Sequence, residues 1–536
     1  MILTPTRFAD PIAETIEMNR VRVAARCAVF CASLSAILVT ATALSSEIDP
    51  RDESGDQRSV SAAETSGSDR PSHLGATDPF GPQIRRSGMT AGVLPTGYSP
   101  AATAAPPIPP SPDQPPAPEP VTSPAMTASS GASLNQFAPW NPAPPCGVQL
   151  TDPGSQYPTV KVTGFFQADA VWFDQDDANK QQVGDVPDGA DFRRARLAAT
   201  GDVWENIGYM IEMDFAAPGR PSFMDVYADF RDMLSIPAKV RVGQWRMPFG
   251  MTGTTSVREL SFIERPLPFA LVPFRQIGVG LLDSVDDDNI TWAVAGFRYP
   301  TDVFGGNVGD SGGYSMATRE TIVLGGEKDD DALMHFGGSY SYLNSSFDTF
   351  RTLSQPEVFA NEVPGPVVPS GAFLNVPAFV DTGLVSAEQA NLFGGEVAGR
   401  AGSFWTQAEI YSMTVDRSGG SNPTFWGAYA HVGYILTGEV RPYSRANGVF
   451  TRILPNDPVK KGGGLGAWEV AGRWSVLDLN DGGINGGRLT DLTAGLNWYL
   501  NPRTKMQFNY IHAFLDAQPT GESDANILAA RAQIDF

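Results

Sequence analysis

The sequence predicts an all-β chain: a transmembrane antiparallel up-and-down β-barrel of about 16 strands, preceded by a disordered N-terminal arm. Beyond residue 158, apolar and polar residues alternate in segment after segment, and alternation places one apolar and one polar face on each strand. Glycine (55) and proline (44) are plentiful, as many turns between strands require. Beyond residue 44 no run has the roughly 18 consecutive apolar residues of a transmembrane helix.

Residues 1–43 have the pattern of a cleavable export signal. A basic stretch begins at Met18, an apolar run follows from Cys27 to Thr40, and Ala41-Thr42-Ala43 supplies small residues for cleavage. We expect translation to start at Met18 and cleavage to follow Ala43; the alternative is an uncleaved membrane anchor. Of the three cysteines only Cys146 would remain, so the mature chain would form no internal disulfide.

Residues 44–157 differ in composition from the rest. Fourteen prolines lie between residues 101 and 145. Such a segment favours extended polyproline conformations and buries too little apolar surface to fold. We predict a disordered periplasmic arm rich in Pro, Ala and Ser, with a tether to cell wall or to a partner protein as the functional alternative.

Residues 158–536 are predicted to form the barrel, and the alternation can be divided into sixteen strands. An even number suits a closed antiparallel barrel, and about 16 strands enclose a water-filled lumen. The predicted strands cover residues 160–173, 192–200, 207–215, 224–230, 239–246, 276–282, 290–299, 319–325, 332–343, 391–399, 403–415, 424–437, 466–479, 489–500, 505–514 and 526–536.

The last predicted strand ends the sequence on Phe536, with Ile534 and Leu528 on the same apolar face. This ending resembles the terminal strand of outer-membrane β-barrels, in which it serves as the assembly signal for the barrel-assembly machinery. An edge strand of a soluble sheet is the alternative. The remaining strands favour the barrel, and therefore localisation in the outer membrane with lipid around the outer wall.

The connections follow the expected asymmetry when both barrel termini are placed in the periplasm. External loops should then be long and periplasmic turns short. Residues 247–275 form the long third external loop and residues 344–390 the fifth, while the turns at 203–206, 286–289, 327–331 and 501–502 are short. The periplasmic connection 439–464 is too long for this rule.

Six segments carry recognisable motifs, in the order DFRRARL (191–197), VGQWRMPF (242–249), LTGEVRPY (436–443), GGGLGAWE (462–469), DLNDGGINGG (478–487) and LNWYLNP (496–502). Together they resemble the phosphate-selective porins O and P over residues 158–536. The resemblance implies a homotrimer of sixteen-stranded barrels. It also implies passive diffusion of small solutes and anions, phosphate or polyphosphate among them, through a lumen narrowed by the third external loop.

Charged residues on the polar faces of strands, and in the third loop, are the candidates for the ion path. An arginine facing lipid at mid-depth costs about 2–4 kcal/mol, so Arg194 and Arg196 should face the lumen, where a guanidinium can bind an anion. The candidate ion-path residues are Arg194, Arg196, Arg241, Arg246, Arg258, Arg265 and Arg275, and the candidate acidic partners are Glu212, Asp214, Asp225, Asp229, Glu259 and Glu264. The alternative is that these arginines only pair with the acids.

The net negative charge argues against a channel that is specific for phosphate. Residues 146–536 carry 29 Lys and Arg against 46 Asp and Glu, a net formal charge of −17. The predicted fifth loop contains Arg351 and no lysine. There are therefore two alternatives. One is a general, weakly selective pore, and the other is an envelope-anchoring barrel whose Pro-rich arm binds cell wall.

Other classes of function find little support. Binding to a nucleic acid would require a basic surface patch, and this acidic chain does not indicate one. The four histidines lie in separate segments without metal-ligand spacing, and no serine or cysteine has a credible histidine partner. We therefore predict no enzyme activity, no catalytic residues, no metal and no cofactor.

Overall fold

The computed structural model describes residues 156–216, 221–233, 238–302, 304–307, 312–326, 332–358, 376–517 and 519–536. The predicted signal peptide, nearly all of the predicted arm, the turn at 327–331 and the middle of the predicted fifth loop lie outside the described residues. Within these ranges no helix is long and apolar enough to cross a membrane.

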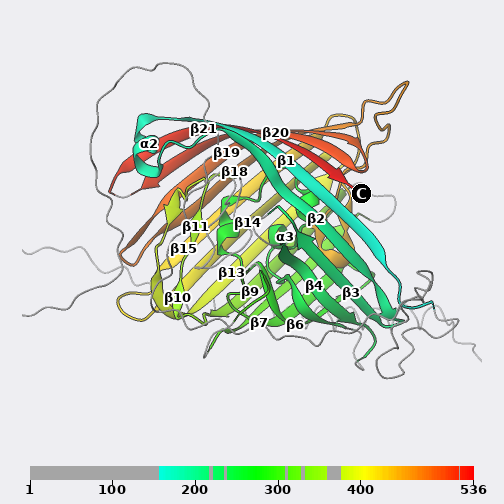
Figure 1. Ribbon diagram of the computed structural model, residues 1–536, viewed down its shortest axis with the longest axis horizontal. Helices are drawn as coiled ribbons and strands as arrows, with labels where there is room; N and C mark the ends of the chain where they lie inside the picture. Colours follow the sequence, from blue (N-terminus) through cyan, green and yellow to red (C-terminus); the bar gives the residue numbers. More distant parts are fainter. Residues whose placement is uncertain are drawn as a thin grey trace, which may run out of the picture. The chain divides into compact units, whose positions relative to one another are not determined.

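Sixteen long strands form the wall of the barrel in the described part of the chain (Figure 1). They are β1 (Lys161–Gln175), β2 (Gly189–Trp204), β3 (Ile207–Asp214), β4 (Ser222–Phe230), β5 (Lys239–Arg246), β6 (Arg275–Val285), β7 (Ile290–Arg298), β8 (Tyr314–Gly325), β9 (Ala332–Asn344), β13 (Val385–Ala401), β14 (Phe404–Arg417), β15 (Thr424–Ile435), β18 (Ala467–Asp481), β19 (Ile484–Asn501), β20 (Thr504–Ala517) and β21 (Gly521–Asp535). Each pairs antiparallel with the next, and β1 pairs with β21, which closes the barrel.

All sixteen predicted strands are present, with ends that differ by a few residues. The strand β5 has the predicted bounds, whereas β13 begins at Val385 rather than at residue 391. Phe536 lies just beyond β21, yet its backbone N–H donates to the Gly164 carbonyl at 2.9 Å and so continues the ladder. The sixteen-stranded, antiparallel, all-β barrel predicted from the alternation is confirmed.

The two faces of the wall differ as the alternation requires. On β21, Leu528 and Ile534 are exposed on the outside, while Arg531 and Gln533 are buried on the inside. On β3, Ile211 is exposed while Glu212 and Asp214 are buried. Apolar side chains on the outer face suit contact with lipid, and polar ones suit a wet interior.

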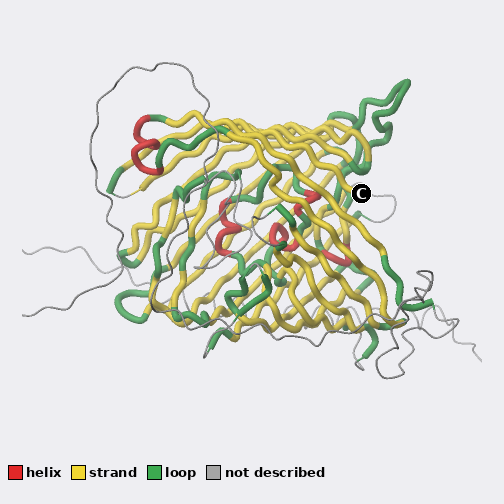
Figure 2. Tube along the Cα trace, in the orientation of Figure 1, coloured by secondary structure: helices red, strands yellow, loops and turns green. Residues whose placement is uncertain are grey.

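Three connections fold into the barrel through the parts that the structure describes, and they leave part of the lumen open. We call residues 247–274 loop L3, residues 345–384 loop L5 and residues 436–466 the terminal-end segment, because it lies at the barrel end that carries Lys161 and Asp535. L3 contains α3 (Met251–Thr254), η2 (Val257–Glu259) and η3 (Leu267–Leu271), and Figure 2 shows helical turns within the barrel.

The other two connections, and the first long loop, contain short elements. L5 contains β10 (Thr349–Phe350), β11 (Leu353–Ser354) and β12 (Val380–Asp381), and the terminal-end segment contains β16 (Tyr443–Ser444), η4 (Arg445–Asn447) and β17 (Val449–Phe450). The helix α2 (Asp177–Val183) lies between β1 and β2. The unexpected length of the connection at 439–464 thus has a reason: it forms a β16–β17 hairpin whose Phe450 is buried.

Candidate pore and constriction

Loop L3 packs its apolar side chains on one side of the inner wall. Ile263, Leu267 and Phe274 are almost fully buried, and they share a core with Leu477 of β18 and Ile527 of β21. The described parts of L5 join the same core, Phe350 and Val358 from its beginning and Val380 from its end. Burial of this many apolar groups holds both loops inside the barrel. The half of the lumen next to β13–β21 is therefore filled.

Arg265 stabilises the turn of L3 from within. Its Nε donates to the Thr252 carbonyl at 3.0 Å and its Nη2 to the Thr255 carbonyl at 2.8 Å. The guanidinium lies 4.8 Å from the ring centroids of both Phe269 and Phe274. Since the side chain is 2% exposed, Arg265 acts on the shape of L3.

Glu264 fixes the loop to the wall through three arginines. Arg194 binds it with two parallel hydrogen bonds of 3.1 and 2.9 Å, Arg193 Nε approaches to 3.1 Å, and Arg531 Nη2 to 2.8 Å. Arg531 also binds Asp169 on β1 through two bonds of 2.7 Å. Burial raises the pKa of the Glu264 carboxyl, but the charges of Arg194, Arg193 and Arg531 outweigh burial and hold that pKa below its ordinary value.

A β-bulge explains how two consecutive arginines reach the same carboxylate. The register of β1 against β2 shifts between Gln167 and Ala168, which pair with Arg194 and Phe192, so Arg193 is the extra residue. Simple alternation would place Arg193 on the outer face, but a bulge redirects a side chain. Sequence reasoning therefore missed Arg193, because the alternation on either side of it gives no sign of a bulge.

A second anchor of L3 comes from β14. The Glu409 carboxylate accepts the backbone N–H groups of Met251 and Thr252 at 2.6 and 2.9 Å, and also the hydroxyl of Tyr411 at 2.8 Å. On β18, Glu469 accepts the Ser261 hydroxyl at 3.1 Å. Because these acidic side chains are buried, L3 is held at both its beginning and its middle by hydrogen bonds that are shielded from water.

A chain of ion pairs follows the opposite wall, from β2 to β6. Arg196 binds Asp214 at 2.7 Å, and Arg275 binds Asp225 at 2.9 Å. Glu212 lies 3.8 Å from Arg196 and 3.9 Å from Arg275, and so links the two pairs. All five of these side chains are buried on the inner face.

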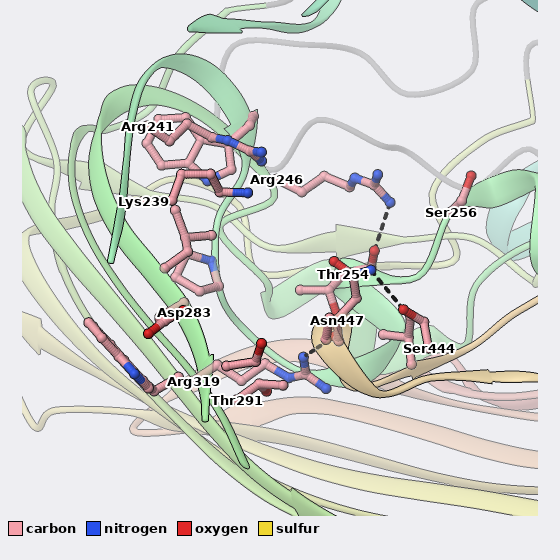
Figure 3. A pocket seen from close by; sticks show the side chains of 18 of the residues that line it. Lys239, Arg241, Arg246, Thr254, Ser256, Asp283, Thr291, Arg319, Ser444 and Asn447 are labelled. Carbon is pink, nitrogen blue, oxygen red and sulfur yellow. Dashed lines mark hydrogen bonds between the residues drawn. The ribbon is translucent and has the colours of Figure 1, made fainter. Parts of the chain in front are cut away.

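An open cavity of about 750 Å³ lies between β4–β7, L3 and the terminal-end segment. Lys239, Arg241 and Arg246 come from β5, while Thr254 and Ser256 come from L3 (Figure 3). Five cationic and four acidic side chains line it: Arg231, Lys239, Arg241, Arg246 and Arg319, with Asp225, Asp232, Glu259 and Asp283.

Each of the five cations that line the cavity has an acidic neighbour. Arg241 binds Asp229 through bonds of 2.7 and 2.8 Å, and its guanidinium lies 3.6 Å above the ring of Tyr227. Arg246 lies 3.6 Å from Asp225 and donates to the Thr254 carbonyl at 2.8 Å. The potential in the cavity is therefore set by closely paired charges of both signs.

The terminal-end segment covers part of the cavity. Arg319 of β8 donates to the Asn447 carbonyl at 3.2 Å (Figure 3). It also donates to the Gly448 carbonyl at 2.8 Å. Arg452 binds Glu259 of L3 at 3.2 Å. Val449 and Phe450 pack with Met251 of L3. The segment and L3 thus support each other across the lumen.

The predicted site residues divide into two groups. Among the candidate arginines only Arg241 and Arg246 belong to the cavity lining described above, and among the candidate acids only Asp225 and Glu259. Arg194, Arg196, Arg265 and Arg275 are buried in contacts with acids or carbonyls. Arg258 lies 5.2 Å from the ring of Phe165 and has no ion pair within the described residues. Their part in ion passage stays a prediction.

Several further charged residues hold the loops and were not singled out from the sequence. They are Arg193, Arg531, Arg473, Arg441, Arg319, Arg452, Asp169, Glu357, Glu409 and Glu469. Strand alternation predicts that most of these face inward, as in Arg531 and Glu409. It does not identify which loop atom each one meets.

The comparisons with known proteins agree with this architecture. The family model for phosphate-selective porin O and P matches residues 160–536. Porin O of Pseudomonas aeruginosa is 24% identical over 412 residues, covering 70% of this chain and 88% of the relative. An uncharacterised protein of Caulobacter vibrioides is 28% identical over 369 residues, covering 65% of this chain and 68% of the relative.

Two solved outer-membrane channels match part of the chain. The anion-selective porin from Comamonas acidovorans has a TM-score of 0.43 at 12% identity, covering 70% of this chain and 99% of that one. The outer-membrane channel DcaP of Acinetobacter baumannii has a TM-score of 0.41 at 13% identity, covering 70% and 97%. The match of the family model to 377 residues, on a closed barrel with a wet interior, is decisive: this chain is an outer-membrane porin of the phosphate-selective porin O and P family.

Proposed function

We propose that the cavity beside β4–β7 is the diffusion path, and that it passes small solutes with a weak preference for anions. The observation that carries this proposal is the composition of the 750 Å³ cavity, which has five cationic side chains against four acidic ones. L3 and L5 fill the opposite half of the lumen with apolar core. Solutes would then pass along the wall formed by β4–β7.

The close pairing of charges supports a weak rather than a strong preference. A guanidinium that shares its hydrogen bonds with a carboxylate has fewer to offer a passing anion. Arg241 is occupied by Asp229 in this way, and Arg351 of L5 by Asp381 at 2.8 Å through its Nε. Phosphate and polyphosphate remain candidate solutes by family, but the paired arginines favour a less specific pore.

A conductance measurement tests the path. In planar bilayers with a salt gradient, Arg246→Ala should reduce anion preference, seen as a shift of the zero-current potential toward cation preference. Arg351→Ala is the matched control, because this arginine lies in L5 and is paired with Asp381. An unchanged potential in Arg246→Ala, or an equal shift in the control, would exclude the proposed path.

A second candidate function is an envelope-anchoring barrel whose Pro-rich arm binds cell wall. It is favoured by the extent of loop packing inside the barrel, which a channel does not need. The same bilayer experiment separates the two functions, since stable conductance steps support the pore and a silent barrel supports the anchor.

We also propose how the barrel is inserted in the membrane and how many copies associate. We expect a homotrimer in outer-membrane lipid, as for the trimer form of OmpT of Vibrio cholerae, a solved structure at 10% identity with a TM-score of 0.41. We also expect the barrel-assembly machinery to use the last strand, where Phe536 bonds to Gly164 and is 52% exposed. Chemical cross-linking in native membranes checks the trimer.

A further inference from the structure

Residues 455–466, which we call the rim loop, lead into β18 and extend beyond the wall at the barrel end that carries the C-terminus (orange in Figure 1). At the tip of the loop the Lys460 backbone N–H donates to the Gly463 carbonyl at 3.1 Å, and the Gly463 N–H donates to the Lys460 carbonyl at 3.3 Å. The Val459 N–H donates to the Leu500 carbonyl of β19 at 2.7 Å. The rim loop is therefore an ordered projection that is bonded to the wall.

The rim loop holds Leu465 in a fixed position on the outside of the barrel. The Leu465 carbonyl accepts the indole N–H of Trp498 at 2.8 Å and that of Trp468 at 3.2 Å. The two indole rings stack, with centroids 5.1 Å apart and planes 14° from parallel. A Cβ at Gly466 would lie 2.4 Å from the Tyr499 carbonyl oxygen, so only glycine permits this close approach. The Leu465 side chain is nevertheless 75% exposed, which means that the surrounding contacts order this leucine without burying it.

The sequence motifs at 462–469 and 496–502 meet at this place, although neither lines the cavity. One exposed leucine would need no explanation, but Leu465 has apolar neighbours. Leu436 is 57% exposed, and its backbone N–H donates to the Trp468 carbonyl at 2.7 Å. Val459 of the rim loop is exposed as well. These side chains and the two indoles make an apolar surface at the end of the wall.

Exposed cations accompany this apolar surface. Lys460 and Lys461 lie at the tip of the rim loop, and Arg503 lies in the turn that follows β19; all three are exposed. Asp457 lies 3.1 Å from Lys460, but both side chains are 65% exposed, and exposed ion pairs are weak. Glu439, the other acid bonded to the loop, is buried. Three exposed cations against one exposed acid suit an anionic partner.

The apolar surface continues the outer face of the wall. Leu436 follows the exposed Val432 and Tyr434 of β15 at a spacing of two residues. Trp468 and Trp498 are outward as well, because their neighbours Glu469 and Asn497 are buried inside. Outward tryptophans at the end of a barrel strand are typical of the boundary between membrane and water. A lipid surface therefore fits this face better than a soluble protein does.

We propose that the rim loop is a lipid anchor, in which Leu465 enters the acyl region of the leaflet at this end of the barrel and Lys460 and Lys461 bind the phosphate groups of its phospholipids. In the predicted orientation this is the periplasmic leaflet of the outer membrane. Buried apolar area and attraction to anionic headgroups together hold such a segment in a membrane surface. The anchor does not depend on what the barrel conducts.

A nitroxide label at position 465 of the full-length protein, reconstituted in phospholipid vesicles, tests the proposal. Leu465→Cys carries the label, and Cys146→Ser removes the cysteine that would remain after export. Leu528→Cys on the outer wall is the control for lipid, and Glu205→Cys in the turn between β2 and β3 is the control for water at the same barrel end. Collisions with oxygen should be frequent at position 465, and collisions with a water-soluble nickel chelate rare, as at position 528.

The lysines are tested with the same label in vesicles of phosphatidylcholine with and without phosphatidylglycerol. Anionic lipid should lower the nickel collisions at position 465 further, and the double change Lys460→Ala and Lys461→Ala should abolish this extra protection. A label that behaves like position 205 in both kinds of vesicle would overturn the anchor. Protection in native membranes but not in vesicles would assign the surface to a protein partner and also overturn it. Equal protection with and without anionic lipid would overturn the contact with headgroups.

Discussion

Arg194 of the barrel wall and Glu264 of loop L3 face each other through two parallel N–H···O bonds of 3.1 and 2.9 Å. Both side chains are at most 1% exposed. Arg194 is a predicted ion-path residue, and that role stays a prediction, but its position makes it a support for L3. Bidentate pairing of this kind gives a fixed geometry as well as energy, so the inner wall determines where L3 lies.

Replacing Glu264 by Gln should loosen L3. The substitution removes the charge of the carboxylate that Arg193, Arg194 and Arg531 share, and loss of one partner from a buried ion pair costs about 3–5 kcal/mol. We expect a lower unfolding temperature of the barrel and a larger, noisier single-channel current. Glu259→Gln is the control, because Glu259 is more exposed and pairs with Arg452 of the terminal-end segment rather than with the barrel wall. An effect of the same size in both variants would contradict the anchoring role of Glu264.

The Glu264 carboxylate should also make the stability of the folded protein depend on pH in the acid range. The pKa of Glu264 is lower in the folded protein than its ordinary value of 4.5, because the three arginine charges outweigh burial. Its stabilising contribution is therefore fully present above pH 4.5 and is lost only as the pH falls through the lower folded value. The stability difference between wild type and Glu264→Gln should be constant above pH 4.5 and shrink below it. Chemical unfolding at several pH values measures this, and a difference that already shrinks near neutral pH would be inconsistent with it.

The barrel wall was predictable from sequence because its signal is local. Alternation of apolar and polar residues fixes which side of a strand faces lipid, and β21 shows this with Leu528 outside and Arg531 inside. The strands at 239–246 and 207–214 were placed within one residue for the same reason. A single inserted residue breaks the rule, and Arg193 in the β2 bulge is the example.

The interior of the barrel was much less predictable. Sequence alternation shows that Arg194 and Arg531 point inward, but their partner Glu264 is about 70 and 267 residues away in the chain. Which of the inward arginines meet a loop and which line open space depends on the path of L3, L5 and the segment 436–466. Those paths are set by packing of Phe274, Phe350 and Phe450, for which no periodic pattern exists.

The barrel should assemble without the residues that precede it. The closing pair of strands, β1 and β21, lies wholly within residues 161–535. A chain in which a signal peptide is joined directly to Pro158 should therefore reach the outer membrane, show heat-modifiable migration and conduct as the full chain does. Failure to fold would show that the preceding residues take part in the structure.

Arg258 and Arg265 should give opposite results when each is replaced by Ala, although both lie in L3. Arg258 is partly exposed and has no ion pair within the described residues, so its loss should move the zero-current potential in a salt gradient toward cation preference while conductance stays steady. Arg265 is 2% exposed and binds the carbonyls of Thr252 and Thr255.

Loss of the Arg265 side chain frees two buried carbonyls, at about 1–3 kcal/mol each, so L3 should loosen and give a noisier, larger current. Arg265→Lys is the control, since a lysine keeps the charge but not the planar fork that reaches both carbonyls; it should stay noisy. If selectivity rather than noise changes in Arg265→Ala, the buried guanidinium acts on the ion path after all. If neither variant changes potential or conductance, L3 has no part in controlling the current.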